Sequence, residues 1–312
     1  MKQSDFQLTG RFDQSIYVSK WAPVDNAPKA AIQLAHGMAE HILRYGEFAE
    51  KLVEAGYVVY GNDHRGHGKT AGSLENVGYF ADEDGFNVVV DDMKLLTDTI
   101  KVENPGLPVF LFGHSMGSLL SRTYITRFGD DLKGVVLSGT TASAGLLGAV
   151  AAMLARIQCA IKGRKAPSKL LDGMVFGAFN KPYNPARTDF DWLSRDDEQV
   201  DLYVNDPYCG AVFTAGFFFD FFTGLNEMFK NENTQKVPKD LPMYIFSGEM
   251  DPVGGTKGKM VAKTAGIYKN AGIKDVELKL YVDARHEMLN ETNREDVYQD
   301  VIQWFDKKLA AS

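Results

Sequence analysis

Cysteine is scarce in this chain of 312 residues, which contains only Cys159 and Cys209. The two lie far apart, in neither a C-x-x-C nor a zinc-ligand pattern. We therefore expect free thiols that pack against apolar neighbours, and a protein with no disulfide, no redox centre and no metal site.

Long apolar runs and basic residues are also in short supply. No uninterrupted apolar stretch is long enough to span a bilayer, and the first residues, Met1 to Phe6, lack the apolar core of a secretory signal. These two absences predict a cytoplasmic protein. The 34 lysines and arginines are outnumbered by 41 aspartates and glutamates, so the formal net charge is -7. Without a basic excess to neutralise phosphates, nucleic acid is disfavoured as a partner.

Apolar residues make up 45% of the chain, which is enough for a large buried core. Short apolar runs predict strands at 31–35, 57–60, 109–112, 135–137, 244–246 and 276–282. Apolar residues at helical spacing predict helices near 44–55, 86–102, 117–128, 257–271 and 294–309. This alternation is typical of an α/β fold with a mostly parallel sheet. Two extended segments, 6–12 and 15–21, predict an antiparallel hairpin at the sheet edge.

The alternation stops between about residues 143 and 236, where small apolar residues, turns and clustered aromatics prevail. We expect a helical cap at 143–235, inserted into an α/β core made of residues 1–142 and 236–312. Seven phenylalanines gather in its last part: Phe213, Phe217, Phe218, Phe219, Phe221, Phe222 and Phe229. They either pack as the core of the cap or line a ligand cavity, and helical spacing favours packing for any single one.

The pentapeptide Gly113-His114-Ser115-Met116-Gly117 lies between the predicted strand 109–112 and a helix-like run that begins at Ser118. A G-x-S-x-G sequence on a strand-to-helix turn is the pattern of a nucleophile elbow, where small neighbours allow strained backbone and expose the serine. Because the chain has 30 glycines, this pattern alone is weak and its meaning depends on what surrounds it.

A serine hydroxyl needs a base to remove its proton during attack on an ester. In hydrolases with a nucleophile elbow, the base follows both the serine and the acid along the chain. Of the six histidines, only His286 lies C-terminal to Ser115. It stands in a loop after the predicted strand 276–282, at an edge of the sheet where it can reach the elbow. We therefore expect His286 to be the general base.

The imidazole must be oriented by a carboxylate that follows a strand between the serine and the histidine. Asp251 meets this condition, because it comes directly after the strand predicted at 243–246. Glu249 is the second candidate. Asp283 and Glu287 share the loop of the histidine and are poorly placed to face it.

The tetrahedral oxyanion of ester cleavage needs two fixed N–H donors. The amide of Met116 is one, because it follows the serine and begins a helix whose dipole favours negative charge. The amide of Met38 is the other, since the loop 36–40 follows the early strand 31–35. Both donors are backbone groups, so neither methionine side chain has a required role.

The histidine pair in Asp63-His64-Arg65-Gly66-His67-Gly68 has a spacing that suggests a metal site, but the sequence shows no convincing third ligand. We expect a tight turn there instead, with polar groups that satisfy loop amides. His114 is expected to be structural.

Together these segments resemble the α/β-hydrolase superfamily and, within it, the monoacylglycerol lipase and lysophospholipase group. The resemblance rests on His36-Gly37-Met38-Ala39-Glu40-His41, on residues 63–68, on the elbow pentapeptide, and on Asp251-Pro252 ahead of His286. It implies a cap after the sixth core strand, a carboxylester substrate with a fatty acyl chain, and no cofactor. For Glu40 and His41, contact with a polar head group and hydrogen bonding within their loop remain open.

The leading hypothesis is a serine esterase that cleaves monoacylglycerols, lysophospholipids or similar small amphiphilic esters through an acyl-enzyme intermediate. The alternative is an amide or peptide hydrolase with the same triad, in which an acidic group of the cap holds a free amine. A ligand-sensing protein without turnover is the third hypothesis. Transient contact of the cap with a membrane surface is left open, because no strongly basic amphipathic helix supports it.

Overall fold

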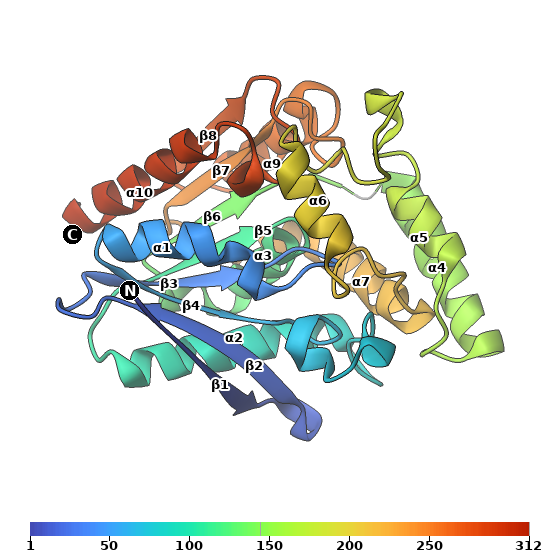
Figure 1. The fold of residues 1–312 in the computed structure, drawn as a ribbon, viewed down its shortest axis with the longest axis horizontal. Coiled ribbons are helices and arrows are strands. Elements are labelled where there is room, and N and C mark those ends of the chain that lie inside the picture. The colour runs from blue at the N-terminus through green and yellow to red at the C-terminus, as the bar shows by residue number, and fades with distance from the viewer. Residues whose placement is uncertain (144, 312) are drawn as a thin grey trace.

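The computed structural model describes residues 1–143 and 145–311. Eight strands form one sheet in the order β1-β2-β4-β3-β5-β6-β7-β8 (Figure 1). They are β1 (Lys2–Thr9), β2 (Ser15–Ala22), β3 (Ala30–Ala35), β4 (Tyr57–Asn62), β5 (Val109–His114), β6 (Gly134–Ser138), β7 (Met243–Gly248) and β8 (Val276–Tyr281). β2 pairs antiparallel with β1 and with β4, and the other pairs are parallel. The predicted α/β fold is confirmed.

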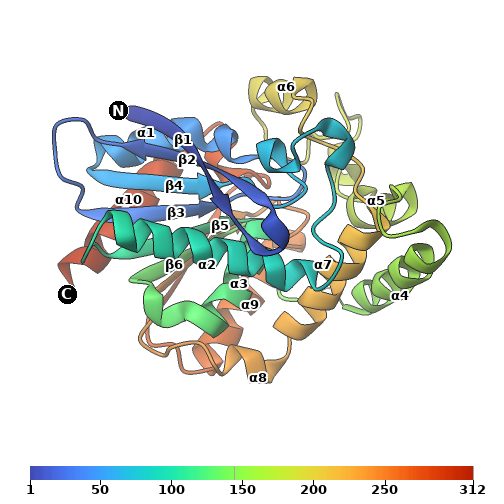
Figure 2. The same cartoon turned by 90° about the horizontal axis from the view of Figure 1, so that it is seen from below.

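Helices cover both faces of the sheet (Figure 2). One face packs against α1 (Gly46–Glu54) and α10 (Arg294–Ala310), and the other against α2 (Gly85–Glu103), α3 (Met116–Phe128) and α9 (Lys259–Asn270). Because both faces are covered, β3, β4 and β5 are buried along their whole length, which explains their continuous apolar sequence. In the described part of the chain, no helix combines the length and the apolar character that crossing a membrane requires.

The N-terminal hairpin lies at the sheet edge, as predicted, but its first strand is placed differently. β1 runs from Lys2 to Thr9 rather than from Phe6 to Phe12. The chain leaves the extended conformation at Arg11–Asp13, where Phe12 has φ 60° and Asp13 has φ 54°. The predicted strand ended at Phe12 because this residue is apolar, but its side chain is 60% exposed and lies outside the strand.

Between β6 and β7 the chain forms helices α4 (Gly145–Lys162), α5 (Lys169–Phe176), α6 (Asp197–Asn205), α7 (Ala215–Met228) and α8 (Asn231–Thr234). We call residues 143–235 the cap; Ala144 within it lies outside the described residues. α4 and α5 lie at the outer edge of the molecule, whereas α7 packs beside α2 (Figures 1 and 2). Gly224 permits this approach, because a Cβ there would lie 2.1 Å from Cγ of Phe86. The division into core and cap domains stays a prediction.

The clustered phenylalanines of the cap are packing residues. Five of the seven are at most 7% exposed: Phe213, Phe217, Phe218, Phe221 and Phe222. They join the apolar cluster that also holds residues of α2 and α3, so they anchor the cap on the core. None of the seven lines the pocket at Ser115.

Candidate active site

Ser115 stands on the turn between β5 and α3, with φ 52° and ψ −118°. A backbone so strained costs of order 1–3 kcal/mol and persists only where the surroundings impose it. An added Cβ at Gly113 would lie 2.5 Å from the carbonyl oxygen of Gly117, and one at Gly117 would lie 2.1 Å from that of Ala35. Close backbone packing therefore requires both glycines, and it holds the serine on a sharp turn.

His286 lies in the loop after β8, and its Nε2 is 2.9 Å from Oγ of Ser115. Its side chain is only 2% exposed. The ring centroid of Trp192, from the cap, lies 5.0 Å from that of His286, and the ring centroid of His114 lies 4.8 Å from it. Core and cap together therefore hold the imidazole against the serine.

Asp251 lies just after β7, and its Oδ1 is 2.9 Å from Nδ1 of His286, which is ion-pair distance. The same oxygen accepts the N–H of Val253 at 2.9 Å, and Oδ2 accepts the hydroxyl of Ser247 at 2.6 Å. The carboxylate is therefore fixed on both oxygens. The structure brings serine, histidine and aspartate together from three separate strand ends.

Asp251 and His286 shift each other's pKa. Burial by itself lowers the pKa of His286, but the Asp251 carboxylate outweighs burial, so the pKa lies above the ordinary value of 6.5. Burial by itself raises the pKa of Asp251, but His286 and the hydroxyl of Ser247 outweigh it, so the pKa lies below 3.8. The carboxylate is thus ionised at neutral pH and stabilises a protonated imidazole.

The other acids considered from the sequence point elsewhere. Asp283 is exposed and Glu249 is partly exposed, and neither forms an ion pair with His286 among the described residues. Glu287 faces away from the histidine, because both of its oxygens accept hydrogen bonds from Arg44, at 2.6 and 2.7 Å. Asp251 is therefore the carboxylate that the structure places beside the imidazole.

Residues 36–41, which follow β3, form what we call the oxyanion loop. The loop curls back on itself, because Ala39 has φ 58° and the N–H of Gly37 donates to Oε1 of Glu40 at 2.5 Å. Glu40 is 3% exposed and also accepts the hydroxyl of Tyr45 at 2.8 Å. Of the two roles left open for Glu40, the structure shows the one within the loop.

The predicted oxyanion donors lie on both sides of the serine. Met38 lines the same pocket as Ser115, and Met116 is the first residue of α3. Within residues 1–143 and 145–311, neither amide donates to another backbone carbonyl. Both N–H groups are thus available to a substrate oxygen.

Arg44 connects the oxyanion loop to the loop of the histidine, a connection that sequence reasoning missed. Its Nη1 lies 2.6 Å from Oε2 of Glu40, and its guanidinium holds Glu287, the neighbour of His286, through two hydrogen bonds. Burial alone raises the pKa of Glu287, but Arg44 outweighs it and lowers the pKa to about 2. The i,i+4 spacing of Glu40 and Arg44 was a visible signal for half of this network.

Four of the other histidines, His36, His64, His67 and His114, are structural. His36 bridges two loops: its Nε2 accepts the N–H of His64 at 2.9 Å, and its Nδ1 lies 2.7 Å from the carbonyl oxygen of Gly37. Burial lowers the pKa of His64 to about 3, that of His67 to about 4 and that of His114 to about 3. All three rings are therefore neutral at pH 7. The expected turn is present, with the N–H of His67 donating to the His64 carbonyl at 3.0 Å.

The cap contacts the oxyanion loop directly. The carbonyl of Ala39 accepts the hydroxyl of Tyr203 at 2.9 Å and the N–H of Gly210 at 3.0 Å. His41 Nε2 lies 2.8 Å from Oδ2 of Asp206, which follows α6. No local sequence pattern relates residues so distant in the chain, so these contacts were not predicted.

A pocket above Ser115 opens between the oxyanion loop and the cap. Most of its apolar lining comes from the cap: Phe176, Phe190, Trp192, Leu193 and Ala211. One acidic cap residue, Asp172 of α5, also lines it, and burial raises the pKa of this carboxyl. The pocket therefore suits a substrate with an apolar part and a polar end.

The chain is similar in sequence to known hydrolases. A family model described as Serine aminopeptidase, S33 matches residues 26–293. Monoacylglycerol lipase of Mycolicibacterium smegmatis is 28% identical over 310 residues, which cover 97% of this chain and 96% of that protein. Monoglyceride lipase of Mus musculus is 29% identical over 309 residues, covering 96% of this chain and 89% of that protein.

Solved structures show the same fold. A thermostable carboxyl esterase from Bacillus coagulans, solved in complex with glycerol, superposes with a TM-score of 0.91 at 27% identity, and 99% of each chain is covered. A lipase in its open form has a TM-score of 0.87 at 28% identity, again with 99% of each chain covered. Because 99% of this chain is covered in both comparisons, the likeness spans the residues of the sheet and those between β6 and β7.

Proposed function

This chain belongs to the serine aminopeptidase S33 family of α/β hydrolases, and from that premise we propose how its site works. The enzyme is a serine hydrolase of carboxylic esters. Its proposed catalytic residues are Ser115 as nucleophile, His286 as general base and acid, and Asp251 as the orienting carboxylate. The observation that carries this assignment is the 2.9 Å contact between Nε2 of His286 and Oγ of Ser115.

Acylation begins when Oγ of Ser115 attacks the ester carbonyl carbon and its proton passes to Nε2 of His286. The carbonyl oxygen becomes an oxyanion, which accepts the N–H groups of Met38 and Met116. Each such donor contributes roughly 3 kcal/mol in comparable sites. When the intermediate collapses, the carbon–oxygen bond to the leaving alcohol breaks and the alcohol takes the proton from Nε2.

Deacylation repeats the same steps with water. His286 removes a proton from water, the hydroxide attacks the acyl carbon, and Oγ of Ser115 leaves with the proton that Nε2 returns. Asp251 balances the positive charge of the imidazolium in both halves of the reaction, which agrees with its lowered pKa.

The proposed substrates are monoacylglycerols, lysophospholipids or similar esters of one acyl chain. The apolar cap residues Phe176, Phe190 and Trp192 offer the acyl chain a desolvated surface, and Asp172 offers an acceptor to a hydroxyl-bearing head group. The names of the relatives support the same class. The experiment must exclude an amide hydrolase, because the same catalytic residues can cleave esters and amides.

The cap also offers a surface for transient contact with lipid aggregates. Along α4 one face leaves apolar side chains exposed to solvent: Val150 at 37%, Met153 at 57%, Ile157 at 47% and Ile161 at 76%. Exposed lysines follow at Lys162, Lys165 and Lys169. An exposed apolar helix face with lysines at and beyond its end, at the outer edge of the molecule (Figure 1), suits an anionic interface from which a single-chain lipid is collected.

Two measurements test the proposed function. A fluorophosphonate probe should label the protein and Ser73→Ala, a variant of an exposed serine, but not Ser115→Ala. In a substrate panel, a monoacylglycerol should be cleaved with a much larger kcat/KM than an aminoacyl amide. Equal labelling of Ser115→Ala would remove the nucleophile assignment, and a preference for the amide would favour the peptidase.

A further inference from the structure

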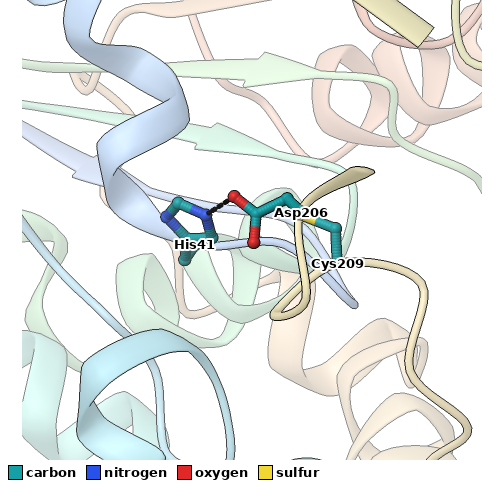
Figure 3. Close-up of side chains that lie close together, drawn as sticks. All are labelled: His41, Asp206 and Cys209. Carbon is teal, nitrogen blue, oxygen red and sulfur yellow. Dashed lines mark hydrogen bonds and ion pairs between the residues drawn. The ribbon is translucent and has the colours of Figure 1, made fainter. Parts of the chain in front are cut away.

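Three potential metal ligands meet where the oxyanion loop contacts the cap (Figure 3). His41 ends the oxyanion loop, and Asp206 and Cys209 lie in the cap segment after α6. One ligand atom from each residue lies within 4.8 Å of the other two, and all three residues are partly exposed. The cysteine spacing gave no sign of this group, because the histidine comes from a segment 165 residues away from Asp206.

The backbone holds the carboxylate and the thiol on one tight turn. The N–H of Cys209 donates to the carbonyl oxygen of Asp206 at 3.0 Å, and the N–H of Tyr208 donates to Oδ1 of Asp206 at 2.8 Å. Oδ1 is thereby occupied, and Oδ2 is the oxygen that faces His41 at 2.8 Å. The turn therefore presents one carboxylate oxygen and one sulfur toward the imidazole.

Imidazole, carboxylate and thiolate together are a ligand set for zinc-like cations rather than for Mg²⁺ or Ca²⁺, which take oxygen ligands. In a tetrahedral zinc site, with bonds of about 2.0 to 2.3 Å, the ligand atoms lie roughly 3.5 Å apart. The separations need to change by about 1.3 Å at most to reach that geometry, because no two of the ligand atoms are more than 4.8 Å apart and the shortest separation, between His41 and Asp206, is 2.8 Å.

The charges of the site also suit a divalent cation. One carboxylate and one thiolate balance a charge of two, and the nearby Arg44 is already paired with Glu40 and Glu287. Burial raises the pKa of the Cys209 thiol, so the metal must displace a proton from sulfur as it binds.

We propose that His41, Asp206 and Cys209 form a binding site for Zn²⁺ or a similar thiophilic divalent cation, and that the bound ion slows ester hydrolysis. The three side chains leave a fourth position for water. Coordination replaces one hydrogen bond by three metal bonds that join the oxyanion loop to the cap. Since the pocket opens between these two segments, a rigid connection hinders the opening that substrate entry and product release require.

Cobalt titration tests the site without relying on catalysis. Co²⁺ added to the reduced full-length protein should bind once and produce a thiolate-to-cobalt absorption band, which Zn²⁺ then abolishes. Ser115→Ala should give the same band, so the result is independent of the proposed nucleophile. Absence of the band in the unaltered protein would overturn the proposal.

Two cysteine variants give a matched comparison. Cys209→Ser should lose the band and bind Zn²⁺ at least about 100-fold more weakly, because loss of an outer-shell partner alone costs 10- to 100-fold. Cys159→Ser, which removes the thiol on α4, should behave as the unaltered protein. If Cys209→Ser keeps the band, or Cys159→Ser loses it, the assigned ligands are wrong.

Ester hydrolysis tests the consequence of binding. Zn²⁺ at the concentration that displaces Co²⁺ should inhibit the unaltered protein and Cys159→Ser, and inhibit Cys209→Ser only at concentrations at least about 100-fold higher. Cobalt binding without any loss of hydrolysis would contradict the coupling between this site and the oxyanion loop.

Discussion

The hydroxyl of Tyr203 donates a hydrogen bond to the backbone carbonyl of Ala39, 2.9 Å away, and so joins cap helix α6 to the oxyanion loop. The ring of Tyr203 also lies 4.8 Å from the guanidinium carbon of Arg44, which holds Glu40 of the same loop. The conformation of the oxyanion loop therefore depends on the cap as well as on the core.

Tyr203→Phe should lower kcat with little change in KM or in melting temperature. The variant keeps the ring over Arg44 but loses the bond that the hydroxyl donates to the Ala39 carbonyl and the one that it accepts from the N–H of Gly210 at 3.1 Å. Because the Gly210 N–H keeps the Ala39 carbonyl as an acceptor, the net loss is one bond worth roughly 0.5–1.5 kcal/mol, and we expect a decrease of about 2- to 12-fold. Steady-state kinetics on a soluble ester measures it. Tyr208→Phe is the control, since Tyr208 reaches Asp206 through its backbone N–H. Equal kinetics for both variants would contradict a role for the Tyr203 hydroxyl.

The pH dependence of kcat/KM should show an acidic limb set by His286. The imidazole must be neutral to accept the serine proton, and its pKa lies above 6.5 because Asp251 outweighs burial. Activity should therefore fall tenfold per pH unit on the acidic side, with a midpoint above pH 6.5. Asp251→Asn removes the negative charge that raises the pKa of His286. In this variant the midpoint of the acidic limb should move to lower pH, and the maximal rate should fall by about 10⁴-fold. A midpoint that stays in place would exclude the pairing.

Arg44→Met should lower the free energy of unfolding by about 3–5 kcal/mol, because it leaves two buried carboxylates without their cation. Urea unfolding followed by circular dichroism measures the loss. Arg11→Met provides the comparison: its ion pair with Asp91 is at the surface, the two side chains being 53% and 26% exposed. That change should cost less than about 1 kcal/mol. Similar losses for the two variants would mean that the buried network contributes little.

Gly117→Ala should destabilise the fold by more than about 2 kcal/mol, since its Cβ would lie 2.1 Å from the Ala35 carbonyl oxygen. Gly266→Ala, inside α9 with nothing within 4 Å of the added Cβ, should instead stabilise by about 0.5–1 kcal/mol. Thermal unfolding of both variants decides the matter, and a Gly117→Ala protein of unchanged stability would contradict the close packing at the elbow.

Met38→Pro should reduce kcat by about 10²- to 10³-fold, because proline removes the N–H that we assign to the oxyanion. Met38→Ala keeps that N–H and should stay within a few fold of the original rate. Both variants need a circular dichroism spectrum to show that they fold. If Met38→Ala is as impaired as Met38→Pro, the side chain rather than the amide matters.

Much of the site was predictable because each proposed catalytic residue follows a strand and the three occur in a characteristic order along the chain. Ser115, Asp251 and His286 each follow a strand, and in a parallel sheet the ends of successive strands meet at one edge. The chain order of nucleophile, acid and base then left few candidates. The strands of the core were predicted for a similar reason, since burial on both faces requires continuous apolar runs.

Local sequence patterns were enough to predict the type of fold, the reaction and the residues expected to carry it, because strand periodicity and turn chemistry act over a few residues. The folded chain was needed to show that Trp192 packs on His286 and that Arg44 joins Glu40 to Glu287. It was also needed to show that the clustered phenylalanines anchor the cap while other cap residues line the pocket. These contacts join residues far apart in the chain. They depend on where the cap helices pack on the core, and that position is set by long-range side-chain contacts rather than by any local sequence pattern.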